Sequence, residues 1–307
     1  MILKEALHKT EVVLVRHHVE DPRLESELLL RQVLGVSRVQ LYQDLHRELS
    51  FEEKVAFEQL IGRRLSGEPI AYITGHREFY GLDFYVDRGV LIPRPETELL
   101  VERALGLARE KPVGSIADVG TGSGAIAVSL ALNLPRARIY ATDVSEAALR
   151  VARLNCRRHG VADRVCLLEG DLLDPLPEPV DLIVANLPYV TEAEVRKQGL
   201  AAFEPELALN GGYDGLEKVR DLCGKLDEKL YPEGTLLLEI GLGQSQTVAG
   251  LLRGLFPLAR IEITPDLSGI DRVVGLTLIR NNSDAAGGIC SRGSINKKTV
   301  AISCGQF

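Results

Sequence analysis

Apolar positions change their spacing along the chain, and each change predicts a different kind of element. Within residues 1–69 they recur at helical intervals. Asp21 and Pro22 can serve as N-cap and first-turn residues of one helix, and Ser50 with Glu53 matches the capping box of another. We therefore expect residues 1–69 to form a small helical domain.

From residue 70 to residue 90 the alternation becomes typical of strands. Phe79 to Val86 is expected to form a hairpin around Gly81 that links two domains. The following segment, 91–98, contains two prolines that keep it extended before a helix that begins near Thr97. This stiff, charged loop is either a solvated cap or a lid over a bound ligand.

Residues 91–280 predict an α/β domain, because apolar runs of strand length alternate with helical patterns from Ser115 on. The fold class expected is a doubly wound, mostly parallel, seven-stranded Rossmann-like sheet. Its last two strands, 259–264 and 272–280, are joined by a connection too short for a crossover helix, so the final strand should run antiparallel. The earlier runs end near Val119, Asp143, Glu169, Asn186 and Gly241.

Residues 281–307 differ in composition from the rest of the chain. They are rich in Asn, Ser, Gly and Lys and have little apolar periodicity. We expect a flexible tail that is dispensable for chemistry. The sequence predicts no role for it.

Composition narrows the function classes. A length of 307 residues fits one large domain or two ordinary ones, and an apolar content of 45% is enough for sizeable cores. The formal net charge of -7 disfavours a generic nucleic-acid binder, which usually has a basic surface, although a local basic patch is compatible with it.

The cysteines and the amino terminus bear on location. The five cysteines form no C-x-x-C pair and have no histidine cluster beside them, so we expect neither a zinc site nor another metal. The charged amino terminus is unlike a signal peptide, and no apolar run is long enough to span a bilayer. A cytoplasmic protein is expected.

The segment 180–189 holds the most informative candidate chemistry. An apolar run ends in Asn186, Leu187, Pro188 and Tyr189, at the carboxyl end of a buried strand, where open α/β sheets bind ligands. The Asn186 side-chain oxygen and the Leu187 carbonyl can hold the two N–H groups of an amide or aromatic amine, while Tyr189 covers its flat face. The lone pair of that weakly nucleophilic nitrogen is then aimed at an electrophile. The alternative is a tight turn with Tyr189 as a core aromatic.

A glycine-rich loop at residues 118–125 indicates a nucleoside cofactor. It follows a strand and opens a helix, so glycines allow close backbone approach and the helix offers free N–H groups. Asp143 ends the next strand, where a carboxylate can bind both ribose hydroxyls, and Asp171 follows the third strand, where an adenine can be contacted. Gly120, Gly122 and Ala125 also fit the dinucleotide fingerprint.

Two features favour S-adenosylmethionine over a nicotinamide dinucleotide. Asp118, just before the glycines, can face the amino group of a methionine moiety but would repel a pyrophosphate. The turn at residues 186–189 has a task in methyl transfer and none in hydride transfer. We therefore expect S-adenosylmethionine as the cofactor.

Over residues 1–280 the chain resembles the release factor glutamine methyltransferases. The resemblance rests on motifs in the family's order: Arg94–Glu98, Asp118–Ala127, Asn186–Tyr189, Glu204–Leu209, Gly211–Leu216, and Leu238–Gly241 with Gln244. The glycine loop is common to many methyltransferases, but its combination with Arg94–Glu98 and Gly211–Leu216 is much more specific.

The resemblance implies a reaction and a set of site residues. It implies methylation of the side-chain amide nitrogen (N5) of the glutamine in the Gly-Gly-Gln loop of class 1 peptide chain release factors, with S-adenosylmethionine as methyl donor. The helical domain would help to dock this protein substrate, or would only stabilise the chain. The implied cofactor-binding residues are Asp118, Gly120, Thr121, Gly122, Ser123, Gly124, Asp143, Asp171, Leu172 and Asn186. The implied catalytic and substrate-binding residues are Asn186, Leu187, Pro188 and Tyr189, joined at the substrate by Arg94 and Glu96 of the lid.

One position departs from the family, which usually has Pro where this chain has Leu187. The contact needed there is a backbone carbonyl, which Leu also supplies, so activity is expected to survive. Asn-Leu-Pro-Tyr is also similar to the motif of ribosomal RNA adenine dimethyltransferases, which keeps an adenine-N6 methyltransferase as the alternative. The acidic balance and the helical amino-terminal domain argue against that alternative, and neither direct nucleic-acid binding nor membrane binding is expected.

Overall fold

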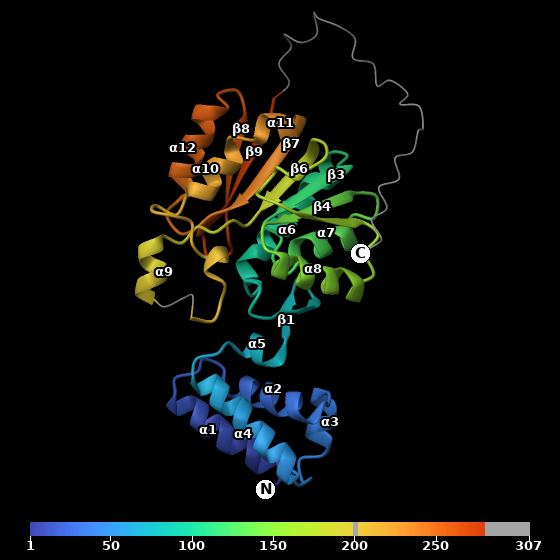
Figure 1. Cartoon of the computed structure of the whole chain (residues 1–307), viewed down its shortest axis with the longest axis vertical. Helices are drawn as coiled ribbons and strands as arrows, with labels where there is room; N and C mark the ends of the chain where they lie inside the picture. The colour runs from blue at the N-terminus through green and yellow to red at the C-terminus, as the bar shows by residue number, and fades with distance from the viewer. Residues whose placement is uncertain (199–201, 280–307) are drawn as a thin grey trace, which may run out of the picture. The chain divides into compact units, whose positions relative to one another are not determined.

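The computed structural model describes residues 1–198 and 202–279, and the chain divides into two compact units (Figure 1). Unit 1 comprises Met1–Arg77 and Val86–Arg88, and unit 2 comprises Glu78–Tyr85 and the described residues from Gly89 on. The domain boundaries expected at 69, 90 and 280 stay predictions, and the tail at 281–307 lies outside the described residues. Among the described residues, no helix has the length and apolar character needed to cross a membrane.

Unit 1 is the helical module expected from the amino-terminal pattern. The capping box at Ser50 is confirmed: Glu53 N donates to Ser50 Oγ over 3.1 Å, and Ser50 N donates to Glu53 Oε2 over 2.9 Å. Leu29, Leu30 and Phe57 lie in its apolar core. The helices are α1 (Leu3–Arg16), α2 (Pro22–Leu34), α3 (Arg38–Gln43), α4 (Phe51–Leu65) and α5 (Ile70–Thr74).

The strand-like expectation for the start of the 70–90 segment was wrong. Ile70–Thr74 is the short helix α5, with Pro69 at its N-cap and Gly75 at its C-cap in the left-handed conformation. Proline can precede or open a helix without losing a hydrogen bond, and glycine can end one, so these two residues outweigh the strand-like alternation. Asp21 does stand at the N-cap of α2, but its side chain makes no capping hydrogen bond.

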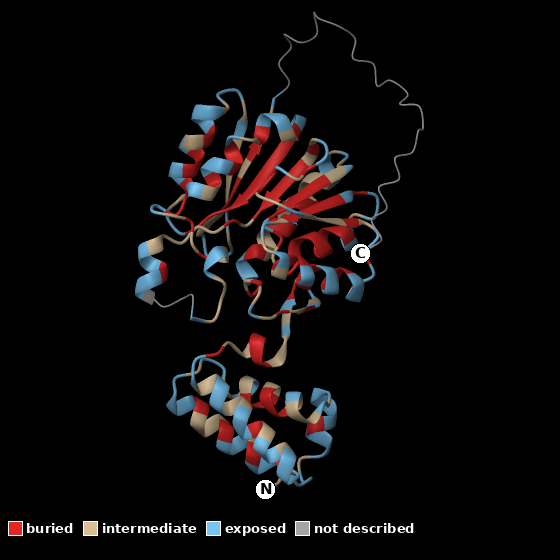
Figure 2. Ribbon diagram, in the orientation of Figure 1, coloured by how far each residue is buried: buried red, intermediate tan, exposed pale blue. Residues whose placement is uncertain are grey.

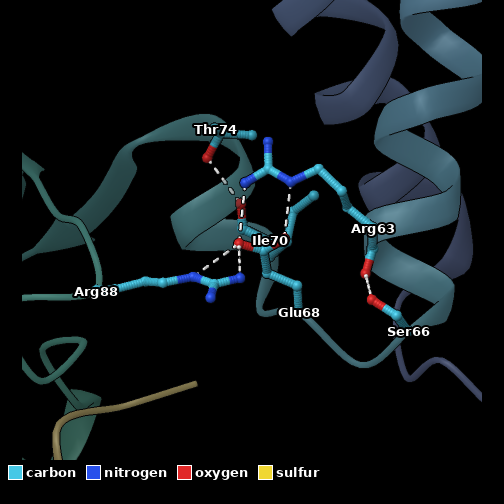
Figure 3. Close-up of polar contacts among 6 residues, drawn as sticks. All are labelled: Arg63, Ser66, Glu68, Ile70, Thr74 and Arg88. Carbon is cyan, nitrogen blue, oxygen red and sulfur yellow. Dashed lines mark hydrogen bonds and ion pairs between the residues drawn. The ribbon is translucent and has the colours of Figure 1, made fainter. Parts of the chain in front are cut away.

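A buried carboxylate joins three parts of unit 1 (Figure 3). Glu68, only 3% exposed, follows α4 and accepts from Arg63 Nε over 2.7 Å and from Arg63 NH2 over 2.9 Å. Arg88, which belongs to the segment that returns to this unit, donates to the same carboxylate over 2.9 Å. The two guanidinium groups lower the pKa of Glu68 to about 2.

The predicted hairpin around Gly81 is present. Strands β1 (His76–Phe79) and β2 (Leu82–Tyr85) form a two-stranded sheet. Tyr80 and Gly81 both have positive φ, 53° and 72°, which is the geometry of a two-residue hairpin turn that matches strand twist.

The main sheet confirms the predicted fold class. It has seven strands in the order β5-β4-β3-β6-β7-β9-β8, and β9 runs antiparallel to both neighbours while the strands from β5 to β7 pair in parallel. The strands are β3 (Ser115–Val119), β4 (Arg138–Asp143), β5 (Val165–Glu169), β6 (Val180–Ala185), β7 (Leu230–Glu239), β8 (Arg260–Pro265) and β9 (Asp271–Thr277).

Helices cover both faces of this sheet, and Figure 2 shows its central strands largely buried. One apolar cluster joins α6 and α7 to one face, and a second joins α10 and α12 to the other. These layers hold the strands rigidly, so the residues at the strand ends are well positioned. The helices of unit 2 are α6 (Glu98–Glu110), α7 (Ala125–Asn133), α8 (Glu146–Arg158), α9 (Glu192–Gln198), α10 (Glu217–Cys223), α11 (Leu226–Lys229) and α12 (Ser245–Leu255), with short 3₁₀ turns η1 (Pro95–Thr97) and η3 (Glu206–Ala208).

Candidate active site

A cavity of about 160 Å³ lies at the carboxyl edge of the parallel strands. The loops that follow β3, β4, β5 and β6 all contribute to its wall, as expected for the ligand site of an open α/β sheet. The predicted site residues that line it are Arg94, Gly120, Thr121, Gly122, Ser123, Asp143, Asp171, Leu172, Asn186, Leu187 and Pro188.

The glycine loop after β3 has the backbone shape that its sequence predicts. Gly120, Gly122 and Gly124 have φ values of 71°, 56° and 79°, which favour glycine strongly. A Cβ at Gly124 would lie 3.2 Å from the Ala152 Cα of α8, so glycine also permits close helix packing. The loop therefore presents its backbone to the cavity, with α7 beginning directly behind it.

Asp118 does not line the cavity and is fully buried beneath this loop. Its Oδ2 accepts from Thr121 Oγ1 over 2.6 Å and from Ala127 N over 3.1 Å, so it fixes both the loop and the start of α7. Within the part of the chain that the structure describes, its Oδ1 has no hydrogen-bond partner. Burial, with a smaller contribution from the charge of Asp143, raises the pKa of Asp118 to about 7.

Asp143 ends β4 and faces the cavity beside the glycine loop. Its carboxylate accepts from the backbone N–H groups of Gly122 and Ser145, both over 2.9 Å, and burial raises its pKa. Each carboxylate oxygen has a second lone pair, so both can still accept from a ligand hydroxyl.

Asp171 and Leu172 contribute the wall after β5. Asp171 lies 3.4 Å from Lys218 Nζ of α10. Leu172 has a φ of 50°, a left-handed conformation that costs roughly 1 kcal/mol for a residue other than glycine. Its carbonyl accepts from Thr142 Oγ1 over 2.8 Å, which helps to hold this conformation.

Asn186, directly after β6, has a defined orientation. Its Nδ2 donates to Thr97 Oγ1 over 3.0 Å, so the NH₂ end of the amide is occupied and the oxygen end remains available as an acceptor. Thr97 is 5% exposed, and its hydroxyl lowers the pKa of the Glu239 carboxyl. The amide is thus held by a buried hydroxyl.

The turn at residues 186–189 is held by two further segments. Gln244 Nε2 donates to the Tyr189 carbonyl over 3.0 Å, and its Oε1 accepts from Gly241 N over 2.8 Å. A Cβ at Gly215 would lie 2.3 Å from the Tyr189 carbonyl oxygen, so only glycine allows the loop at residues 211–216 to pack there. Among the described residues none donates a hydrogen bond to the Leu187 carbonyl, which leaves it as an acceptor beside Asn186.

The loop at residues 91–98 is tied to the segment that precedes η3. Glu204 accepts from Ile92 N over 3.1 Å and from Arg94 NH2 over 2.5 Å. Leu91, Pro93 and Arg94 line the cavity from one segment, and Pro205, Leu207 and Ala208 line it from the other. Arg94 is therefore engaged with Glu204 at the rim, whereas Glu96 is exposed and does not line the cavity.

Gly124 and Tyr189, like Asp118 and Glu96, do not line the cavity, and direct ligand contacts by these four residues stay predictions.

The sequence interpretation had assigned no role to Thr97, Glu239 or Asn155. Asn155 of α8 donates to the Ser123 carbonyl over 2.8 Å and to the Tyr85 carbonyl over 2.9 Å, and so links the glycine loop to β2. The only sign of this role in the sequence is that Asn155 is a polar residue on an otherwise apolar face of its helix.

Two protein families match parts of the chain. The model of the PrmC N-terminal domain matches residues 5–75, and that of the methyltransferase small domain matches residues 95–204. The second match contains the glycine loop, Asp143 and the turn at residues 186–189. Each unit of the structure thus contains most of one matched region.

Close relatives extend over nearly the whole chain. The release factor glutamine methyltransferase of Moorella thermoacetica is 46% identical over 276 residues, which cover 89% of this chain and 97% of the relative. That of Geobacter sulfurreducens is 41% identical over 276 residues, covering 89% and 95%. The solved protein-(glutamine-N5) methyltransferase (release factor-specific) of Alicyclobacillus acidocaldarius is 32% identical, with a TM-score of 0.41, over 64% of this chain and all of that one.

Proposed function

The chain belongs to the release factor glutamine methyltransferase family, and we propose that it methylates the N5 amide nitrogen of the glutamine in the Gly-Gly-Gln loop of a class 1 peptide chain release factor. It is an S-adenosylmethionine-dependent methyltransferase, as its methyltransferase domain and its relatives indicate. The observation that carries the proposal is the orientation of Asn186, whose NH₂ end is occupied by Thr97 and whose oxygen remains for a substrate N–H.

The residues present fit S-adenosylmethionine. A Cβ at Gly120 would meet Leu187 Cδ2 at 3.4 Å and Asn186 O at 3.9 Å, so glycine keeps open the space between the cofactor loop and the turn at residues 186–189. The unpaired, buried Oδ1 of Asp118 suits an ammonium group, either directly or through a water. We assign ribose binding to Asp143 and the adenine wall to Asp171 and Leu172. When bound, S-adenosylmethionine supplies an electrophilic methyl group on a cationic sulfur.

The substrate amide is held by acceptors during methyl transfer, and the nitrogen releases one proton to solvent after it has gained positive charge. Asn186 Oδ1 and the Leu187 carbonyl accept its two N–H groups, which leaves the nitrogen lone pair pointing away from both. These contacts strengthen as the nitrogen gains positive charge, so they stabilise the transition state more than the ground state. Tyr189 bounds the flat face of the amide, and Arg94 lies at the rim through which the substrate loop enters.

The decisive experiment is methyl transfer from labelled S-adenosylmethionine to purified release factor and, in parallel, to ribosomal RNA, followed by peptide mass mapping. We expect label on the Gly-Gly-Gln glutamine, lost when that glutamine is replaced by alanine. A release factor that carries the same replacement at an exposed glutamine elsewhere is the matched control. Label on RNA alone would reject the proposal in favour of adenine-N6 methylation.

Unit 1 and the location of the protein complete the proposal. We propose that unit 1 helps to dock the release factor, for which its exposed apolar side chains Val39, at 66%, and Phe51, at 78%, are candidate contacts. We also propose a cytoplasmic location, because the cysteine pattern fits a reducing compartment. Deletion of residues 1–69 is expected to raise the KM for the release factor far more than the KM for S-adenosylmethionine.

A further inference from the structure

Glu239, within the motif Leu238–Gly241, is a buried acid at the edge of the active site and has no role in the proposed reaction as stated above. It is the last residue of β7 and is 3% exposed. Because Ala185 of β6 pairs with Leu238 of β7, the next residues, Asn186 and Glu239, follow at the same edge of the sheet. Glu239 does not line the cavity, so any effect on the substrate passes through its neighbours.

The contacts of Glu239 lead to the turn that holds the substrate. The Thr97 hydroxyl is near enough to the carboxylate to lower its pKa, and the Tyr189 hydroxyl donates to Oε1 over 3.5 Å. The other oxygen, Oε2, has no hydrogen-bond partner among residues 1–198 and 202–279. A buried carboxylate that is only partly satisfied destabilises a fold, and such a residue at an active site commonly serves function.

The single proton of Thr97 determines how Asn186 is oriented. A hydroxyl that donates to a carboxylate can only accept from its other neighbour, and the amide can satisfy that need only with its NH₂ end. This agrees with the 3.0 Å contact from Asn186 Nδ2 to Thr97 Oγ1. Were Glu239 neutral, the Thr97 proton could turn toward Asn186 and favour the flipped amide, which would present N–H groups to the substrate.

We propose that Glu239 is a positioning residue: its carboxylate, acting through Thr97, keeps the side-chain oxygen of Asn186 directed at the substrate amide. The Tyr189 hydroxyl contact, which is long, is the minor part of this arrangement. The proposal deepens the proposed function and rests on it, since it concerns how the same amide is held.

The charge of Glu239 adds a pH dependence to this geometry. Burial raises its pKa to about 7, Glu96 acts in the same direction, and Thr97, Arg272 and Tyr189 oppose them. The carboxylate is therefore formed as the pH rises through about 7. Turnover should rise over the same interval, because the productive orientation of Asn186 needs the ionised form.

The test is single-turnover and steady-state methylation of the release factor by Glu239→Gln between pH 6 and pH 9. Glutamine keeps the shape but can donate to Thr97, so we expect turnover to fall about 10-fold or more at pH 8, less than for direct removal of a transition-state contact. The KM for S-adenosylmethionine should stay unchanged, and the rise in turnover near pH 7 should disappear. Glu233→Gln, the same change at the exposed end of the same strand, is the matched control and should match the wild type.

A second pair of variants keeps the proposal testable if Glu239→Gln fails to fold. Thr97→Val removes the hydroxyl and should lower turnover about as much as Glu239→Gln does. Thr97→Ser keeps the hydroxyl and should keep the wild-type turnover. Glu239→Gln combined with Thr97→Val should cost little more than either change alone, because both break one chain of contacts. Wild-type turnover and pH profile in Glu239→Gln, or equal loss in Thr97→Val and Thr97→Ser, would overturn the inference. Absence of methylation by the wild type would instead reject the proposed function.

Discussion

Replacing Glu68 by glutamine should destabilise unit 1 through one well-defined loss. Glu68 is 3% exposed and is held by Arg63 and Arg88, and its pKa falls from the ordinary 4.5 to about 2. At about 1.4 kcal/mol for each pKa unit, this corresponds to about 3.5 kcal/mol at neutral pH. The arginine side chains are 44% and 60% exposed, so solvent screening reduces the expected loss to about 2 kcal/mol.

The pH dependence of this loss follows from the direction of the pKa. A lowered pKa means that the stabilisation is fully present above about 4.5 and is lost as the pH falls toward 2. We therefore expect the difference in unfolding free energy between wild type and Glu68→Gln to be largest at pH 7 and about 1 kcal/mol smaller at pH 3.5.

Urea unfolding followed by circular dichroism at both pH values measures the difference. Glu58→Gln is the matched control, since Glu58 lies on the surface of α4 with its side chain 61% exposed and pairs only loosely with Lys54. It should cost less than about 0.5 kcal/mol. A Glu68→Gln variant as stable as Glu58→Gln at pH 7, or a loss that does not shrink on acidification, would show that the arginine pair does not stabilise the fold.

Further predictions concern unit 2. Asn186→Ala should lower turnover by about 10²-fold or more, and near-normal turnover would contradict the assigned role of its oxygen. Tyr189→Phe, which keeps the ring, should retain most of the turnover that Tyr189→Ala loses. Gly215→Ala should also reduce turnover while the protein stays folded, because the new Cβ would lie 2.3 Å from the Tyr189 carbonyl oxygen and displace the turn; an unchanged rate would indicate that the turn adjusts freely. Asp118 and Glu239 have pKa values raised to about 7, so their stabilisation is present below their ordinary pKa values and is lost as the pH rises through about 7. Thermal midpoints of the ligand-free protein should accordingly fall between pH 5 and pH 8, and a rise would contradict the assigned burial of these charges.

The sequence by itself determined the elements whose signals are local. The capping box at Ser50 and Glu53 starts α4, and the short connection between the last two apolar runs forces β9 to run antiparallel. The glycine loop was equally readable, because glycine tolerates the positive φ that Gly120 and Gly122 adopt. These features depend on neighbours in the chain, so no knowledge of the fold was needed.

Only the tertiary structure decided which side chains meet across the sheet. Thr97 precedes α6, Asn186 follows β6 and Glu239 ends β7, and no periodicity relates these three positions. The same holds for Asp118, because its place in the sequence did not show that its carboxylate would also hold the glycine loop from beneath. The strand order and the pairing of β6 with β7 determine which of these side chains meet. Segments that are distant in the sequence can form hydrogen bonds only where the packing of helices on the sheet brings the ends of those segments together.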